Sequence, residues 1–157
     1  MKQRVYIETT VVGYLTGRPS RDVVIAAHQE LTRHWWETRS STFDLLVSEL
    51  VREEAGKGDE EASTKRMTII GEIPILQTSD AAVSLAKQLV SPGPIPPESA
   101  ADALHIALAA FNGVDYLLTW NCKHLANAAL RGRIEAIVEE AGYACPIICT
   151  PEELMED

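Results

Sequence analysis

Residues 4–15 read RVYIETTVVGYL, and this stretch decides the fold class. Its first four residues are a short run that favours β-structure, which predicts a buried strand ending at Glu8. Thr9 and Thr10 offer hydroxyl groups for the N-cap of a helix over residues 11–15. A buried strand that passes directly into a helix is typical of parallel sheets covered by helices.

The same alternation continues along the chain. Further strands are predicted over residues 43–47, 74–76, 116–118 and 146–149, and further helices after Ser20, after Ser48 to residue 55, and over residues 60–70, 80–90, 98–111 and 131–141. Ser20, Ser48 and Asp80 are the expected caps of three of these helices. In the helix after Ser20, the residues at the spacing of a core-facing apolar stripe are Val24, Ala27, Leu31 and Trp35. The proline-rich residues 91–97 form an internal turn. The sequence therefore predicts an α/β protein with one domain over residues 1–157 and a central parallel sheet.

The composition limits the class of protein. Apolar residues make up 46% of the chain, which is enough for one sizeable core. Only three apolar residues separate MKQR at the N-terminus from Glu8, unlike a signal peptide. No apolar run is long enough to span a bilayer. We expect a cytoplasmic protein that does not enter a membrane.

The formal net charge of −9 argues against a protein that coats nucleic acid through a general basic field. It does not exclude a nuclease, because a carboxylate site is acidic and its metal supplies the positive charge that meets the phosphate. The three cysteines, Cys122, Cys145 and Cys149, are too few for a disulfide framework. A zinc clip at Cys145 and Cys149 is disfavoured, because a strand lies between them and no second Cys/His pair is near.

Polar residues follow several predicted strands at their carboxyl ends, where parallel sheets bind ligands. They are Glu8, Ser48 and Asn121, with Glu49, Glu53 and Glu54 on the helix that follows Ser48. Asp102 lies in the first turns of the helix after the proline-rich residues and could reach the same point. Crowded carboxylates repel one another unless a cation lies between them, so their convergence would indicate a metal site. Each has a structural alternative: a helix-dipole contact for Glu8, a solvated helix face for Glu49, Glu53 and Glu54, and a turn for Asn121. Asp102 alone favours function, because its helix is otherwise almost entirely apolar.

These residues form four motifs that together resemble the PIN-domain nucleases, and in particular the VapC-type toxins of toxin–antitoxin pairs. The motifs are VYIETT (residues 5–10), SELVREE (residues 48–54), DALHIA (residues 102–107) and LLTWN (residues 117–121). Each motif is weak by itself, but four in order at fitting separations are fairly specific.

The resemblance implies a three-layer α/β/α PIN-like fold and metal-dependent hydrolysis of RNA. It places Glu8, Glu54, Asp102 and Asn121 around Mg²⁺ or Mn²⁺. Thr119 and Ser48 would support the site, and Thr9 would contribute through its hydroxyl. It also implies a homodimer inhibited by a small cognate antitoxin. His105 is expected to lie in the core or behind the ligands and not to bind the metal itself.

Some positions depart from the family pattern. Glu8 stands where the family usually has Asp, Asn121 carries no charge, and position 124 is a histidine where many relatives have an acid. Glu49 or Glu53 could replace Glu54. These departures leave open a PIN-like domain that binds RNA or protein with little or no catalysis. A nucleotide-binding Rossmann-like domain is disfavoured, because no glycine-rich phosphate motif follows the first strand.

The adjacent Trp35 and Trp36 cannot both point into one core from a single helix face. One of them is therefore expected either at an oligomer interface or against a neighbouring helix.

Overall fold

The computed structural model describes residues 1–156. Five parallel strands form one sheet in the order β3-β2-β1-β4-β5. The strands are β1 (Arg4–Ile7), β2 (Asp44–Ser48), β3 (Ile75–Leu76), β4 (Tyr116–Leu118) and β5 (Ile147–Cys149). The helices are α1 (Thr9–Thr16), α2 (Val23–Thr38), α3 (Glu49–Ala55), α4 (Glu60–Ile70), α5 (Asp80–Val90), α6 (Ala100–Phe111) and α7 (Ala128–Glu140), with short 3-10 turns η1 (Ser40–Thr42) and η2 (Pro97–Ser99).

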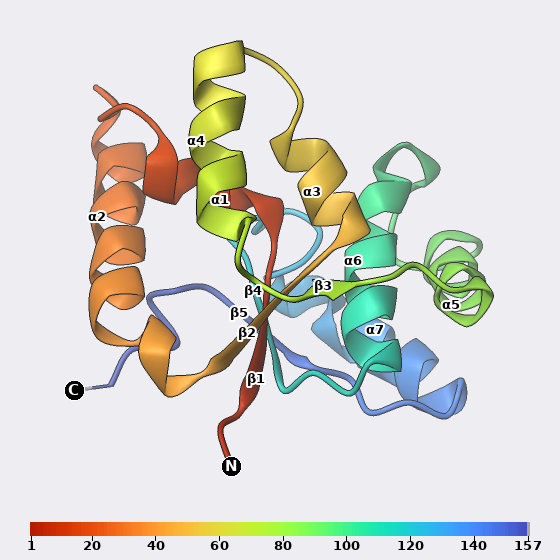
Figure 1. Ribbon diagram of the computed structural model, residues 1–157. Helices are drawn as coiled ribbons and strands as arrows, with labels where there is room; N and C mark the ends of the chain where they lie inside the picture. Colours follow the sequence, from red (N-terminus) through yellow and green to blue (C-terminus); the bar gives the residue numbers. More distant parts are fainter. Residues whose placement is uncertain (157) are drawn as a thin grey trace.

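The central strand β1 shows why the sheet needs two helical layers. Val5, Tyr6 and Ile7 are all fully buried. Consecutive side chains of a strand point to opposite faces, so both faces of the sheet must be covered. Helices α1–α4 lie together on one side of the sheet and α5–α7 on the other (Figure 1). The predicted three-layer α/β/α arrangement with a central parallel sheet is confirmed.

The strand order places a crevice between β1 and β4. From β1 the chain proceeds to β2 and β3 in one direction, and β4 and β5 then extend the sheet from the other side of β1. In open parallel sheets, ligands bind beyond the carboxyl ends of the strands at this point of reversal. The backbone N–H of Glu8 donates to the carbonyl oxygen of Leu118 at 3.0 Å, which joins the ends of β1 and β4. Residues 8 and 119 therefore border the expected binding crevice.

Helix α1 begins at Thr9, two residues earlier than predicted. Glu8, not Thr9 or Thr10, is its N-cap: the Glu8 backbone is extended, with φ −81° and ψ 155°, and its carboxylate accepts from the N–H of Thr10. Glutamate is uncommon as an N-cap residue, whereas threonine is favoured there, so the sequence pattern pointed to the two threonines. Thr9 and Thr10 therefore lie inside the helix, where their hydroxyl groups donate to the carboxylates of Glu54 and Glu8 and do not cap the helix.

Helix α2 also differs from the prediction. Its N-cap is Asp22 and not Ser20, because the Asp22 carboxylate accepts from two backbone amides of the first turn. The predicted core position Val24 is 62% exposed, whereas Gln29 and Thr32 are buried. Both polar side chains have hydrogen-bond partners, so their burial does not leave a polar group unpaired.

Other element boundaries differ by a few residues. The strand predicted over residues 43–47 is shifted by one residue to β2, and β3 and β5 each begin one residue later than predicted. Ser79, not Asp80, caps α5. The helix predicted over residues 98–111 begins as the turn η2, and the helix predicted over residues 131–141 begins at Ala128, capped by Asn127. The cap assigned to Ser48 is confirmed, since its hydroxyl accepts from the N–H of Val51.

Trp35 is the deeply buried member of the tryptophan pair. Its indole N–H donates to the carbonyl oxygen of Leu154 at 3.2 Å. Trp36 is half-buried and packs against the same core, with its ring centroid 6.4 Å from that of Trp35. An interface at this position stays a prediction. None of the helices within residues 1–156 is long and apolar enough to cross a membrane.

Candidate metal-binding site

Glu8 holds its carboxylate in the crevice between β1 and β4. It is only 4% exposed. Its oxygen Oε1 accepts hydrogen bonds from the hydroxyl groups of Thr10 and of Thr119, the latter at 2.6 Å, and Oε2 accepts from the backbone N–H of Thr10 at 3.1 Å. Thr119 is fully buried directly after β4. Three donors therefore fix the orientation of this carboxylate.

Glu54 reaches the same crevice from the last turn of α3. Its oxygen Oε1 accepts from the Thr9 hydroxyl at 2.5 Å and lies 2.8 Å from Nε2 of His105. Partial burial raises the pKa of Glu54, but the hydrogen bonds from His105 and Thr9 outweigh this effect, so the pKa is lowered overall. The predicted contribution of the Thr9 hydroxyl thus takes the form of a hydrogen bond to Glu54.

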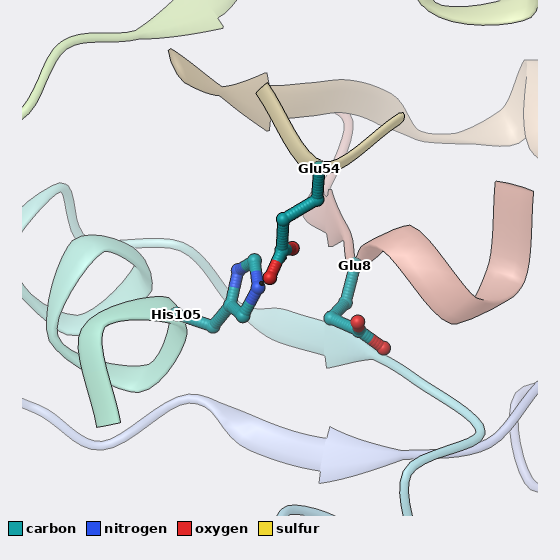
Figure 2. Close-up of side chains that lie close together, drawn as sticks. All are labelled: Glu8, Glu54 and His105. Carbon is teal, nitrogen blue, oxygen red and sulfur yellow. Dashed lines mark hydrogen bonds and ion pairs between the residues drawn. The ribbon is translucent and has the colours of Figure 1, made fainter. Parts of the chain in front are cut away.

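Glu8, Glu54 and His105 converge although they come from three different elements. One potential ligand atom from each lies within 4.8 Å of the other two. Figure 2 shows the Glu54 side chain pointing down to the His105 ring, with the Glu8 carboxylate on the neighbouring strand end. Two carboxylates at this distance create a strongly negative, poorly hydrated region, which a divalent cation would neutralise.

Asp102 and Asn121 lie around a second histidine. The Asp102 carboxylate, in the first turn of α6, contacts Nδ1 of His124 at 2.9 Å. The side-chain oxygen of Asn121 accepts from the backbone N–H groups of Lys123 and His124. The N–H of Asn121 donates to the Thr119 hydroxyl at 2.9 Å, which connects this group to Glu8. Hydrogen bonds therefore connect Asn121 to Glu8 through Thr119, and Asp102 to Asn121 through His124. Asp102 is not part of the group formed by Glu8, Glu54 and His105.

Tyr6, a buried polar residue behind Glu54, was not among the residues predicted for the site. The Tyr6 hydroxyl is hydrogen-bonded to Ser48 Oγ at 2.7 Å and to His105 Nδ1 at 2.6 Å. Burial raises the pKa of the Tyr6 hydroxyl well above its ordinary value. The signal was present in the sequence: a tyrosine inside a strand buried on both faces needs partners for its hydroxyl group. The expectation that His105 lies in the core, behind the carboxylates, agrees with its 1% exposure.

Comparison with known proteins gives a fold but no close relative. No protein-family model and no curated protein matches the sequence. The solved structure of Mycobacterium tuberculosis VapC20, a sarcin–ricin loop cleaving toxin, matches with a TM-score of 0.60 and 12% identity over 89% of this chain and 96% of that chain. The structure of VapBC2 from Rickettsia felis, bound to a DNA fragment from its promoter, matches with a TM-score of 0.58 and 13% identity over 94% of this chain and 98% of that chain.

The chain shares the three-layer α/β/α fold of these two VapC structures, a PIN-like fold. Within this fold, the structure separates the three neighbouring acids of α3. Glu49 and Glu53 are exposed: Glu49 contacts only the N–H of Thr78, at 3.4 Å, and Glu53 faces Lys57 at 4.0 Å. Glu54 is the acid of α3 that approaches Glu8. The alternative in which Glu49 or Glu53 takes the place of Glu54 has no geometric support.

Proposed function

We propose that this protein is a metal-dependent endoribonuclease, the toxin of a toxin–antitoxin pair. The observation that carries the proposal is the meeting of Glu8 and Glu54, from elements far apart in sequence, at the point where the strand order of the sheet reverses. The two solved structures of similar fold give further support, because one is described as a toxin that cleaves the sarcin–ricin loop and the other as a VapBC complex.

The donor set suits a hard divalent cation. Glu8, Glu54, Asp102 and Asn121 offer only oxygen atoms, the ligands that Mg²⁺ and Mn²⁺ prefer. Among the described residues, the hydrogen bonds to Glu54 all reach Oε1, so its Oε2 is available. These four residues would hold the cation. When bound, the metal would activate water and polarise the phosphodiester.

The other residues of the site would orient these ligands. Thr10 and Thr119 hold the Glu8 carboxylate, and Thr9 holds that of Glu54. His124 contacts Asp102 and, through its backbone, Asn121, so it fixes the relative position of both. Such preorganisation matters because a catalytic site tolerates displacements of only about half an ångström.

The partners belong to the same proposal. We propose that residues 1–157 act as one nuclease domain, that its substrate is cytoplasmic RNA, and that the protein forms a homodimer held inactive by a small antitoxin. The complex described for the Rickettsia felis neighbour supports the antitoxin.

A second candidate is a PIN-like domain that binds RNA or protein with little catalysis. The side-chain oxygen of Asn121 favours it, because two backbone N–H groups already occupy the atom that would bind the cation.

A cleavage assay separates the two candidates. Purified protein is incubated with mixed RNA in Mn²⁺, in Mg²⁺ or in chelator, beside Asp102→Asn and the control Asp80→Asn, which changes the exposed first-turn acid of α5. We expect cleavage only with metal, its loss in Asp102→Asn, and full activity in Asp80→Asn. Saturating Mn²⁺, at about 100 times Kd, should stabilise the fold by about 2.7 kcal/mol. An Asp102→Asn protein that cleaves at the full rate would contradict the nuclease proposal.

A further inference from the structure

A continuous line of hydrogen bonds runs from the core to Glu54. It connects Ser48 of β2, Tyr6 of β1, His105 of α6 and Glu54 of α3, with distances of 2.7, 2.6 and 2.8 Å between successive polar atoms. Ser48 and Tyr6 are fully buried and His105 is 1% exposed. The proposed hydrolysis uses only the last member of this line. The first three are buried polar groups outside the proposed hydrolysis, so their presence in the core needs a separate explanation.

The direction of each hydrogen bond follows from its neighbours. The N–H of Val51 can only donate, so Ser48 Oγ accepts from it at 3.1 Å. If Ser48 then donates to Tyr6, the Tyr6 hydroxyl donates to Nδ1 of His105, and Nε2 carries the ring proton toward Glu54. Every polar hydrogen in this arrangement has an acceptor.

The reverse direction fails at both ends. If Tyr6 donates to Ser48, the Ser48 proton has no acceptor within residues 1–156. Nδ1 of a neutral His105 would then carry the ring proton, and the lone pair of Nε2 would face the Glu54 carboxylate at 2.8 Å. Two acceptors at that distance repel each other, and a buried polar group without a hydrogen-bond partner destabilises the fold.

We propose that Tyr6 and His105 are positioning residues of the metal site, which fix Nε2–H of His105 as a donor to Oε1 of Glu54 and so present Oε2 to the cation. Thr9 donates to the same oxygen, so Oε1 receives two hydrogen bonds. The presence of a cation at Oε2 rests on the proposed function, whereas the position of the proton on Nε2 of His105 rests on the hydrogen bonds alone.

The same arrangement excludes His105 as a ligand despite its proximity to Glu8 and Glu54. A histidine binds a metal through the lone pair of one ring nitrogen while the other nitrogen donates its proton to a partner. In His105 the lone pair of Nδ1 accepts from Tyr6, and Nε2 holds the proton. The site therefore keeps an all-oxygen donor set, which favours Mg²⁺ and Mn²⁺ over zinc.

Two substitutions of His105 distinguish the effect of losing the Nε2–H donor from the effect of losing the volume of the ring. In His105→Gln the side-chain amide nitrogen can take the place of Nε2, whereas in His105→Asn it reaches only the place of Nδ1. We expect the Mn²⁺ dissociation constant, measured by calorimetry, to rise about 10–100-fold in His105→Asn, as for lost outer partners of metal ligands, and by less than about threefold in His105→Gln. Ile106→Val, a buried neighbour in α6, is the control for general loss of packing and should bind Mn²⁺ like the wild type.

The ring nitrogen spectrum of the wild-type protein gives a second readout that needs neither a variant nor a metal. The ¹⁵N shifts should identify a protonated Nε2 and an unprotonated Nδ1 in His105. A proton on Nδ1 would overturn the inference. Equal Mn²⁺ affinity of His105→Gln and His105→Asn would also overturn it while leaving the proposed nuclease intact. A wild-type protein that binds no Mn²⁺ would overturn the proposed metal site, and with it the role of Oε2.

Discussion

Replacing Thr119 with valine removes one hydroxyl group from a fully buried position and leaves the side-chain volume almost unchanged. The lost hydroxyl donates to Oε1 of Glu8 at 2.6 Å and accepts from the N–H of Asn121 at 2.9 Å. A hydrogen bond to a charged group contributes about 1.5–3 kcal/mol, and a stranded buried N–H costs about 1–3 kcal/mol. Because Asn121 is only half-buried and water can reach part of it, we expect Thr119→Val to lower the free energy of unfolding by about 2–4 kcal/mol.

The functional effect should exceed this loss of stability. In Thr119→Val, the Glu8 carboxylate loses one of its three hydrogen bonds and keeps the two from Thr10, so its orientation in the crevice is less firmly fixed. Loss of a group that orients a metal ligand typically lowers affinity or activity about 10–100-fold. Mn²⁺ calorimetry and RNA cleavage, both at a temperature where the variant is fully folded, measure the effect.

Thr32→Val is the matched control. Thr32 is likewise fully buried, and its hydroxyl donates to the carbonyl oxygen of His28 and accepts from the Trp120 indole at 2.7 Å, so its hydrogen bonds within residues 1–156 do not involve the carboxylates. We expect a loss of about 1–3 kcal/mol in unfolding free energy with unchanged Mn²⁺ affinity. If Thr119→Val retains the metal affinity and cleavage rate of Thr32→Val, the reasoning that Thr119 orients Glu8 is refuted.

Three further predictions concern stability and reactivity. Asp22→Ala should lower the unfolding free energy by about 1 kcal/mol in chemical denaturation, because it removes the cap of α2, whereas Asp22→Asn should be nearly neutral; equal losses would contradict the capping role. Iodoacetamide at pH 8 should modify the exposed Cys122 of the native protein and spare Cys145 and Cys149, whose pKa values burial raises to about 12, with mass spectrometry as the readout. In the unfolded chain, the Cys149 thiol loses its proton near pH 9, whereas in the folded protein it keeps the proton up to about pH 12. The contribution of Cys149 to the free energy of unfolding is therefore complete below pH 9 and falls by roughly 1 kcal/mol per pH unit between pH 9 and 12. A free energy of unfolding that stays constant over this range would contradict the prediction.

The fold was largely predictable because its signals are local. The run of apolar residues before Glu8 and the cap at Ser48 each depend on a few neighbouring residues, and both appear in the structure as expected. Alternating strands and helices leave few arrangements for a chain of this size. Helix starts were less predictable: Glu8 and Asp22 took the caps assigned to the threonines and to Ser20, since several adjacent side chains can serve as caps.

The face of α2 shows where periodicity fails. The spacing of Val24 with the later apolar residues predicted a buried stripe, yet Val24 is exposed and Thr32 is buried. Thr32 is buried because the Trp120 indole, distant in sequence, needs an acceptor at that place. A pattern within one helix does not contain this information.

By itself, the sequence determined the order of strands and helices, the position of Glu8 at a strand end, and the set of acids that could serve a metal. Only the tertiary structure decided that Glu54, and not Glu49 or Glu53, lies close to Glu8. The same holds for the line of hydrogen bonds that connects Glu54 to His105, Tyr6 and Ser48. The physical reason is the range of the interactions. Hydrophobic periodicity and capping act over a few residues, whereas these hydrogen bonds join residues 42 to 99 positions apart and exist only once the sheet and both helical layers are assembled.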